Sequence, residues 1–600
     1  MNHKKLLLTL TLCLCALLCM VVTASASEVQ NTGSHSHELC KKTVCTNPEH
    51  IKSGTHGSVT FATELRQVGD KLYIDDNEWT YNNNVGYVLP AGNYYLGTDL
   101  TLDHQIRISN SQEVKVTLCL NGKTITCTEN YDAVIQTPTT YPVEFTLCDC
   151  RPSDSVGKIT HANGIRGVGV ELKNNNAVND VAHKFIMYNG CITGNKTTNG
   201  AGVFLYSNTT FTMYGGSITE NECNSDTHLP CGGGVYVHNG ATFTMYGGDI
   251  TKNQADYGGG VSTSGDTANF TMYGGSITEN HANKSGGGIY STSNNISIYG
   301  GGVTNNSVTK TGNAGGIYVS SSDTLTVGGN VNISGNWQGD SKESGSKSNV
   351  YLNGNTSGSS ATIVIEKKLT GENSRIGVTT ATSVATTPNA SVKIAAGKGT
   401  YAITDEDKGH FTPDTGYCEV QKKDDGALYL THVHSGGEAT CTAAAKCGGC
   451  SQPYGNTNPN NHALVHHEAQ APTCTAVGWE AYDTCSRCTY TTYREIPAAH
   501  TYGGTWVKGQ DGHWKVCEVC QNRSEVKPHD WKDATTSAPK TCTVCGATTG
   551  TKLSAHYYYS PAKTEDTTVS PKAGDPGVLL YAGLALASLT GLACTAKKRH

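Results

Sequence analysis

Hydrophobic and polar residues alternate with period two along residues 183–337, in runs that are short. The phrase Phe-x-Met-Tyr-Gly-Gly begins at Phe211, Phe243 and Phe270. Period-two alternation broken by glycine predicts short β-strands joined by tight corners, because glycine accepts positive φ without strain. The region shows no 3.6-residue period of an amphipathic helix. We therefore expect an all-β structure here.

The repeat has the length of one coil of a solenoid. Its shared tyrosines are separated by 26, 32, 27 and 26 residues, a spacing typical of solenoid repeats. If equivalent strands pair in parallel about 4.8 Å apart, Phe211, Phe243 and Phe270 stack in the interior. The tyrosines form a stripe that either contacts a sugar or protein ligand or covers the glycine corner. They are Tyr188, Tyr214, Tyr246, Tyr273 and Tyr299.

An asparagine recurs at one corner of each repeat. A side-chain amide can donate to one neighbouring coil and accept from the other, so the pattern predicts a ladder of amides. Its members are Asn195, Asn221, Asn253, Asn280 and Asn306. These repeats resemble the right-handed parallel β-helix of the pectin-lyase-like class and, more closely, the Gly-Gly-x-Ile-x-x-Asn repeats of bacterial surface proteins. The right-handed turn follows from this resemblance and from the crossover preference of parallel strands.

The predicted β-helix covers residues 86–430, with terminal rungs and a cap over 338–430. Short apolar runs separated by Gly, Asn and Pro predict its first rungs, and a solenoid needs a cap to close its exposed end. The phrase Leu147-Cys148-Asp149-Cys150 resembles the opening of this kind of surface β-helix. Alternation turns Cys148 and Cys150 to one face, where they are buried free thiols, a disulfide or a reactive pair.

Both ends of the chain carry targeting features. A basic then apolar N-terminus with the small-residue site Ala24-Ser25-Ala26 predicts a signal peptide over residues 1–26. The apolar stretch 578–596, followed by Lys597-Lys598-Arg599, predicts a transmembrane helix with its basic end in the cytoplasm. We therefore expect an exported protein held at the cell surface. A net charge of −6 argues against a nucleic-acid partner, which needs a basic face.

The segment 570–600 resembles the cell-wall sorting signal of Gram-positive surface proteins, whose motif is Leu-Pro-x-Thr-Gly. Pro571 and Gly574 match this motif, whereas Ser570 and Ala573 depart from it. The resemblance implies a sortase partner, cleavage between Ala573 and Gly574, and attachment to the cell wall. Without cleavage, the helix would anchor the protein in the membrane. Residues 557–569 read as a linker.

Four small modules occupy residues 431–556. Ten of the 24 cysteines lie here and include four Cys-x2-Cys pairs, each followed by a histidine 9 to 12 residues later. Two thiolates in a tight turn bind one tetrahedral ion, and a third cysteine and a histidine complete a closed site. Modules of about 30 residues lack a core, so a metal or a cross-link must hold them. Structural zinc is the first hypothesis, and disulfides are the alternative in an oxidising compartment.

The predicted ligands are, module by module, Cys441, Cys447, Cys450 and His462; Cys474, Cys485, Cys488 and His500; His513, Cys517, Cys520 and His529; and Cys542, Cys545 and His556. Phrases such as Ala471-Pro472-Thr473-Cys474 resemble stalk modules found beside β-helices in clostridial-type surface proteins. That resemblance implies a spacer, and closed sites leave no metal position open for catalysis.

The N-terminal segment 27–85 also contains cysteine and histidine. These residues are His35, His37, Cys40, Cys45, His50 and His56. The order His37-x2-Cys40-x4-Cys45-x4-His50 offers zinc-ligand types but fits no strict metal motif. Two interpretations stay open: a metal site, or a flexible segment with incidental ligands.

The residues that precede the ladder asparagines include two glutamates that are candidates for catalysis. Glu220 and Glu279 would lie two coils apart, on the order of 9.5 Å, near the upper end of inverting-glycosidase separations. With Lys252 between them, they equally fit an acid-base-acid row on a solvated face. We expect an anchored surface protein whose β-helix serves adhesion to a glycan or a host surface protein. The alternatives are a polysaccharide-degrading enzyme, lyase or glycosidase, and a passive wall spacer.

Overall fold

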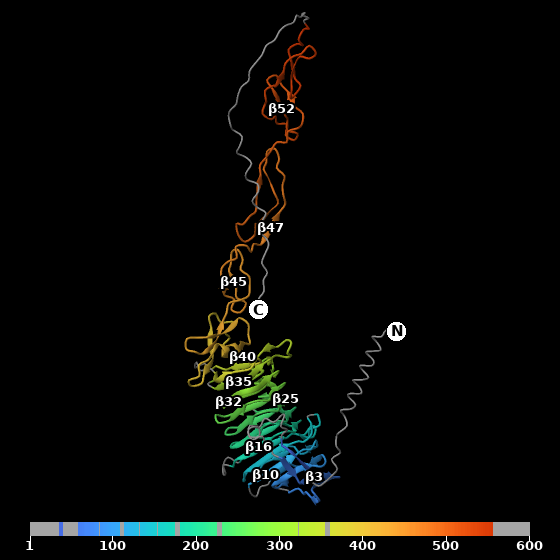
Figure 1. Cartoon of the computed structure of the whole chain (residues 1–600), viewed down its shortest axis with the longest axis vertical. Helices are drawn as coiled ribbons and strands as arrows, with labels where there is room; N and C mark the ends of the chain where they lie inside the picture. The colour runs from blue at the N-terminus through green and yellow to red at the C-terminus, as the bar shows by residue number, and fades with distance from the viewer. Residues whose placement is uncertain are drawn as a thin grey trace, which may run out of the picture. The chain divides into compact units, whose positions relative to one another are not determined.

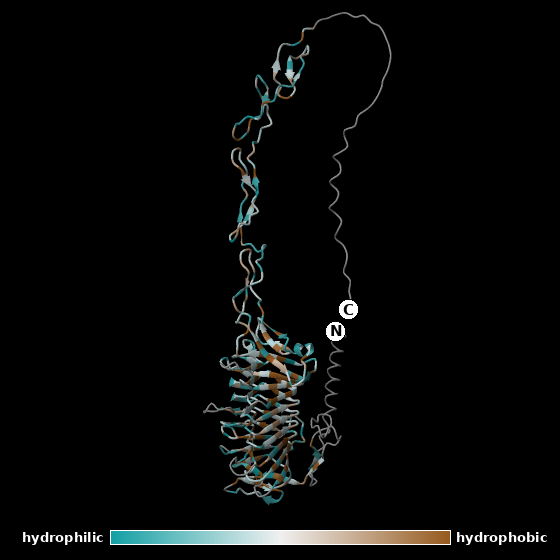
Figure 2. Ribbon diagram, turned by 90° about the vertical axis from the view of Figure 1, so that its left-hand side faces the viewer, coloured by the Kyte–Doolittle hydropathy of each residue, from teal (hydrophilic) through white to brown (hydrophobic). Residues whose placement is uncertain are grey.

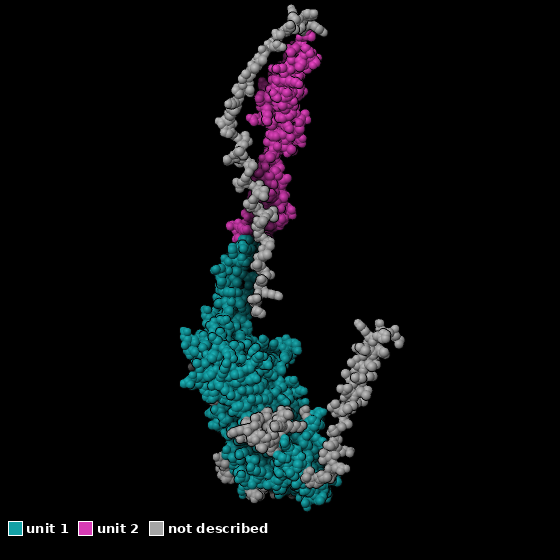
Figure 3. Space-filling model, in the orientation of Figure 1, with its two compact units in different colours: residues 1–462 teal, residues 463–600 magenta. Residues whose placement is uncertain are grey.

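The computed structural model describes residues 35–39, 58–82, 85–108, 113–130, 132–152, 154–174, 181–224, 231–293, 295–321, 323–354 and 361–555. The predicted signal peptide, sorting signal and apolar C-terminal stretch lie outside these residues, as do Cys40, Cys45, His50, His56 and His556. The chain divides into two compact units, residues 1–462 and 463–600 (Figure 3). Within the described ranges, no helix is long and apolar enough to cross a bilayer.

The first unit is built on a parallel β-solenoid of about 11 turns, which confirms the predicted fold class (Figure 1). Strands from successive turns pair in parallel, so residues at the same place in each repeat become neighbours. Phe185 pairs with Phe211, Phe211 with Phe243, and Phe243 with Phe270. The predicted register of the repeats is therefore the observed one.

Three columns of strands form the faces of the solenoid. The phenylalanine column contains β3 (Thr63–Val68), β7 (Gly92–Leu96), β10 (Val114–Cys119), β13 (Val143–Cys148), β16 (His183–Met187), β20 (Thr209–Met213), β24 (Thr242–Met245), β28 (Asn269–Met272), β32 (Asn295–Thr304), β35 (Thr324–Ser334), β39 (Thr362–Leu369) and β41 (Ser391–Gly397).

The isoleucine column contains β8 (Leu100–Leu102), β11 (Thr124–Cys127), β14 (Lys158–His161), β17 (Cys191–Thr193), β21 (Ser217–Thr219), β25 (Asp249–Thr251), β29 (Ser276–Thr278) and the second halves of β32 and β35. The valine column contains β6 (Tyr87–Leu89), β9 (Ile106–Ile108), β12 (Ile135–Gln136), β15 (Val170–Leu172), β19 (Val203–Leu205), β23 (Val235–Val237), β27 (Val261–Ser264), β31 (Ile289–Thr292), β34 (Ile317–Val319), β38 (Val350–Leu352), β40 (Arg375–Thr380) and β42 (Phe411–Pro413).

A smaller sheet runs along a fourth side. Its parallel strands are β18 (Lys196–Thr197), β22 (Glu222–Cys223), β26 (Gln254–Tyr257), β30 (His281–Ser285), β33 (Ser307–Val308) and β36 (Trp337–Gln338), with β37 (Ser346–Lys347) antiparallel at the edge. Ser346 and Lys347 form this edge strand by pairing with β36.

Buried aromatic and aliphatic side chains form one continuous core along the solenoid. Hydrophobic strand segments recur from turn to turn (Figure 2). From Phe145 to Phe270, successive phenylalanine rings stack with centroids 4.6–5.2 Å apart and ring planes within 19° of parallel. Met213, Met245 and Met272 are fully buried beside them. Burial of these aromatic side chains, together with the leucine, isoleucine and valine side chains of the same core, stabilises the solenoid.

A row of buried asparagines runs along one corner. Each Nδ2 group donates to Oδ1 of the next asparagine at 2.9–3.0 Å, which satisfies amides that would otherwise be buried without a partner. The members are Asn195, Asn221, Asn253, Asn280, Asn306, Asn336 and Asn349. The row begins at His161, 2.8 Å from Asn195 Oδ1, and ends where Asn349 donates to Asp414 at 2.6 Å. It is thus longer than the clear repeats.

Antiparallel strands flank the solenoid at both ends. At the N-terminal end they are β1 (His35–Glu38), β2 (Ser58–Phe61), β4 (Lys71–Ile74) and β5 (Asn77–Glu78). At the other end, β43 (Cys418–Lys422) and β44 (Leu428–His432) pair antiparallel with each other, and β44 with β41. A short helix, α3 (Asp405–Gly409), begins with a capping box between Thr404 and Asp407.

Short hairpins make up the rest of the described chain. They are β45 (Ala445–Lys446) with β46 (Pro453–Tyr454), β47 (Leu464–His467) with β49 (Tyr482–Cys485), β48 (Gly478–Trp479) with β50 (Glu495–Ile496), β51 (Val507–Lys508) with β52 (His513–Trp514), and β53 (Trp531–Lys532), β54 (Lys540–Cys542) and β55 (Thr548–Thr549).

Candidate functional site

Cysteine and histidine side chains converge in compact groups that could each hold a metal ion. In every group, one ligand atom per residue lies within 4.8 Å of the others. One group in the first unit contains His432, His434, Cys447 and Cys450. In the second unit, one group contains Cys474, His500, Cys517 and Cys520, and another contains His513, His529, Cys542 and Cys545.

The distances inside these groups fit a tetrahedral ion. With metal–sulfur bonds near 2.3 Å and metal–nitrogen bonds near 2.0 Å, ligand atoms lie roughly 3.3–3.8 Å apart. Cys450 Sγ lies 3.5 Å from His434 Nδ1, and Cys447 Sγ lies 3.6 Å from His432 Nε2. In the second unit, the sulfur atoms of Cys474 and Cys517 lie 3.3 Å apart. The donor set of two to three sulfurs and one to two imidazoles suits zinc or a similar soft divalent ion.

One backbone hydrogen bond recurs beside each Cys-x2-Cys turn. The residue after the first cysteine donates its N–H to the carbonyl of the residue after a histidine that precedes the pair. Glu518 donates to Thr501 at 3.0 Å, next to His500, and Thr543 donates to Asp530 at 2.8 Å, next to His529. Gly448 donates to Ser435 and Ser486 donates to Ala463 in the same way. This bond sets the histidine beside the turn.

The structure therefore groups the ligands differently from the module order of the sequence. Cys447 and Cys450 meet His432 and His434, which precede them, and not Cys441 and His462. Likewise Cys517 and Cys520 meet Cys474 and His500, whereas His513 and His529 join Cys542 and Cys545. The observed grouping differs from the expected one, with the histidine after each pair, because the backbone hydrogen bond of each turn joins it to the chain that precedes it. Cys441 and His462 lie in the first unit, and Cys485 and Cys488 lie in the second.

The local field favours thiolates at the first cysteine of three pairs. Hydrogen bonds from the backbone at Cys520 are the main reason that the pKa of Cys517 falls to about 5. Burial opposes the charge on Cys542, but the backbone N–H groups of Cys545 and Val544 outweigh it and lower its pKa to about 6. Because the thiolate is the form that binds metal, the lowered pKa values of Cys517 and Cys542 favour metal binding at these two turns.

The five repeat tyrosines form one continuous stack on the outside of the solenoid. Successive rings from Tyr188 to Tyr299 have centroids 5.0–5.4 Å apart and planes within 23° of parallel. Tyr273 is 46% exposed, and the other four are half-buried. Because the rings are stacked, each ring covers the face of its neighbour.

A hydroxyl row runs parallel to the tyrosine stripe. Thr212, Thr244, Thr271 and Ser297 occupy the preceding outward position and pair in register across four strands. At the C-terminal end, the Tyr299 hydroxyl bonds Glu366, and Lys367 Nζ lies 4.6 Å from the Tyr299 ring centroid. The stripe therefore ends at a charged pair.

A second aromatic stack, missed by sequence reasoning, lies on the valine column. Tyr290 stacks on Tyr318, and Tyr318 on Tyr351, at 5.0 and 5.8 Å. Where the column carries Ser262, Tyr257 from β26 lies against Tyr290 at 4.9 Å. A tyrosine recurs after Gly-Ile in successive repeats, at Tyr290 and Tyr318, and this recurrence could have predicted the stack.

Glu220 and Glu279, the catalytic candidates, lie at an exposed corner. Both have positive φ, 57° and 58°, as has Lys252 between them at 56°. The equivalent residue is glycine at position 194. Their shared feature is the left-handed backbone that the chain needs before each ladder asparagine. This corner role accounts for their recurrence without invoking catalysis.

No protein-family model matches the chain, and neither curated proteins nor solved structures yield a match.

Proposed function

We propose that this protein is a cell-surface adhesin whose solenoid displays the tyrosine stripe to an extended glycan. The observation that carries the proposal is the unbroken stack from Tyr188 to Tyr299 on the outside of the solenoid. A ligand with its own regular repeat could contact several turns at once, and binding at linked sites raises overall affinity far above that of one contact.

The chemistry of the stripe favours a polyhydroxylated ligand. The phenol edges and the neighbouring threonine hydroxyls can both donate and accept hydrogen bonds. Ring faces, which apolar ligands would use, are covered by the neighbouring rings. A host surface protein is the other ligand class considered, and it is separated from a glycan by the experiment below.

The cysteine and histidine groups complete the proposal. They would hold structural zinc in a stalk that carries the solenoid. Mixed sulfur and imidazole groups with converging ligand atoms support metal over disulfides, because bridges would not require histidine at each turn. Export through the signal peptide, and attachment to wall or membrane through residues 570–600, are part of the same proposal and rest on the sequence.

The test is an array of glycans and matrix proteins probed with the exported chain. A triple variant, Tyr214→Phe with Tyr246→Phe and Tyr273→Phe, keeps the stack and removes three hydroxyls. Three lost hydrogen bonds of about 0.5–1.5 kcal/mol each predict a loss of binding of about tenfold or more. The matched control, Tyr290→Phe with Tyr318→Phe, changes the second stack and should bind like the parent chain.

Other outcomes separate the alternatives. Binding only to proteins on the array would show that the ligand is a protein and not a glycan. Binding to nothing on the array would favour the passive spacer. Equal binding by the triple variant would remove the stripe from the proposal. Release of reducing ends or unsaturated products from a polysaccharide panel, lost in Glu279→Gln, would establish the enzyme instead.

A further inference from the structure

Two cysteines on the outer face of the first turns are completely buried. Along β10 the side chains alternate, with Lys115 exposed and Thr117 half-buried on the outside. Cys119 continues that outer row, yet it is 0% exposed, and so is Cys148, its partner in register on β13. The hairpin of β1 and β2 accounts for this burial, because Phe61 of β2 packs on both cysteines.

The hairpin turns two histidines toward these cysteines. On β1, His35 and His37 alternate with Ser36 and Glu38, which are exposed on the opposite side. Ring stacking fixes both imidazoles: His37 lies on Phe61 at 4.7 Å and His35 on Tyr95 at 5.1 Å. Their Nε2 atoms consequently converge on the solenoid surface.

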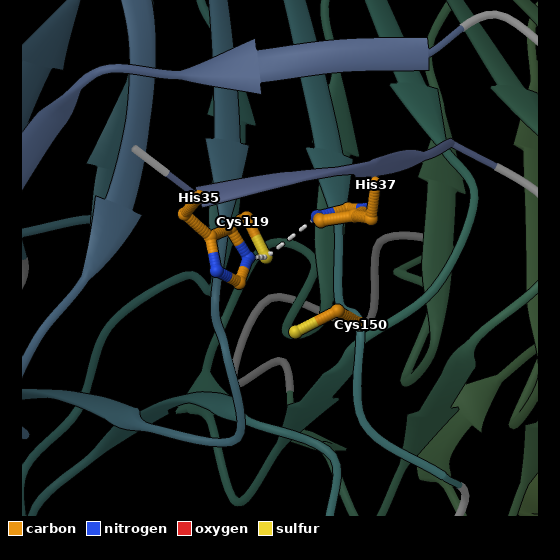
Figure 4. Close-up of side chains that lie close together, drawn as sticks. All are labelled: His35, His37, Cys119 and Cys150. Carbon is orange, nitrogen blue, oxygen red and sulfur yellow. Dashed lines mark hydrogen bonds between the residues drawn. The ribbon is translucent and has the colours of Figure 1, made fainter. Parts of the chain in front are cut away.

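The four polar ligand atoms meet at one point (Figure 4). Cys119 Sγ lies 3.2 Å from His37 Nε2 and 3.4 Å from His35 Nε2. Cys150, just after β13, completes the group, whose ligand atoms lie within 4.8 Å of one another. Nδ1 of His37 lies 2.9 Å from the Glu38 carbonyl. With Nδ1–H donating to that carbonyl, Nε2 is unprotonated and available to a metal.

We propose that His35, His37, Cys119 and Cys150 form a zinc-type site that clasps the N-terminal hairpin onto the solenoid. Two thiolates and two imidazoles are the donors of a closed tetrahedral site, whereas calcium and magnesium require oxygen ligands. Simple packing would not need two imidazole nitrogens directed at one sulfur. The ion would join chain segments more than 80 residues apart, as the 82-residue separation of His37 and Cys119 shows.

The clasp also closes one end of the tyrosine stripe. Tyr188, the first ring of the stripe, packs with Cys148, Cys150 and Phe61 in the same small cluster. Releasing the hairpin would uncover this end of the outer row. The metal site does not depend on glycan binding, so either proposal can fail without the other.

The experiment uses the full exported chain loaded with Co²⁺, whose thiolate charge-transfer band reports cysteine ligation. The double variant His35→Gln with His37→Gln changes half-buried side chains on the hairpin and leaves the solenoid core intact. It should bind one equivalent of Co²⁺ less than the parent chain, as should Cys119→Ser. Hydrogen exchange should then show loss of protection in β1 and β2 but none in β20, β24 and β28.

Cys148→Ser is the matched control, because Cys148 lies in the same row and outside the four-ligand group. It should retain the full Co²⁺ stoichiometry. The proposal is overturned if the histidine double variant binds as much Co²⁺ as the parent chain. It is equally overturned if mass spectrometry of the parent chain finds Cys119 in a disulfide with Cys150, or if chelation leaves the exchange of β1 unchanged.

Discussion

The solenoid and the second unit differ in the side chains that they bury. Every turn of the solenoid buries phenylalanine, methionine or branched aliphatic side chains between its neighbours. In the described part of the second unit, the buried hydrophobic residues are Cys485, Cys517 and Cys542, while Leu464 and Val519 are 56% and 75% exposed. A repeated core stabilises the first region, and cysteine-centred groups replace the core in the second.

This difference predicts which changes will destabilise each region. A solenoid distributes its stability over nearest-neighbour contacts between turns. The second unit concentrates it in a few ligand groups that join distant residues, such as Cys474 with Cys517 and Cys520. Because His513 belongs to the next group yet lies between His500 and Cys517 in sequence, the two groups interleave. If both groups bind zinc, as proposed, loss of one ion should also destabilise the neighbouring group.

Metal removal should separate the two regions most sharply. Structural zinc sites in small domains supply apparent binding free energies of about 10–16 kcal/mol, which the second unit has no core to replace. A strong chelator added to the full chain should abolish amide protection over residues 463–555 and leave β16 to β35 protected. Hydrogen exchange read by mass spectrometry measures both at once.

Chelator saturated with zinc beforehand is the control for metal removal and should change nothing. Retained protection over residues 463–555, together with cysteines that resist alkylation, would assign the stability of this region to disulfides.

A core truncation should have the opposite regional effect. Phe243 stacks between Phe211 and Phe270 and is fully buried. Phe243→Ala should lower the free energy of unfolding of the solenoid by about 3–5 kcal/mol, since no neighbour can fill the cavity. Urea unfolding followed by circular dichroism measures this loss, and bound metal should stay constant. Val68→Ala, at a residue 59% exposed, should cost less than about 0.5 kcal/mol.

The asparagine row should show a smaller cost. Asn253 Oδ1 accepts hydrogen bonds from the side-chain amide and from the backbone N–H of Asn221, and Asn253 Nδ2 donates to Asn280. Asn253→Leu would leave buried donors on Asn221 unsatisfied and should destabilise the solenoid by about 1–3 kcal/mol. Asn295→Ala provides the control, because Asn295 is exposed and donates to Asp266. Equal effects of the two variants in urea unfolding would deny the row its structural role.

The repeat pattern predicted the parts of the solenoid that recur in every turn, but not the parts that occur once. The stacking of Phe211, Phe243 and Phe270 follows from a constant phrase. Asn336 follows Asn306 by 30 residues, within the spacing of the repeats, so the period did point to it. Asn349 follows Asn336 by only 13 residues, and Asp414 ends the ladder from a different loop, so no period pointed to these two residues.

The ligand groups show a second kind of limit. Spacing identified the cysteines and histidines as ligand types, but it could not say whether a turn binds residues before or after it. A backbone hydrogen bond such as Thr543 to Asp530 decides that choice, and it depends on strand pairing. The meeting of His37 with Cys119 depends on a hairpin folding onto a remote turn, which no local pattern encodes.

The smallest expected effect concerns the corner before each ladder asparagine. Glu279 has φ 58°, and the same corner is occupied by Gly194 at 69° and Gly335 at 70°. Left-handed backbone costs a non-glycine residue roughly 1–2 kcal/mol, partly offset by the greater unfolded-state entropy of glycine. Glu279→Gly should therefore raise the free energy of unfolding by less than about 1 kcal/mol, and Glu279→Val should lower it. Glu279→Gln should leave it unchanged if backbone geometry, and not the carboxylate, determines the residue at this corner. A clear loss of stability in Glu279→Gln, measured by urea unfolding, would instead show that the carboxylate interacts with another group. Catalysis by Glu279 would then have to be considered again.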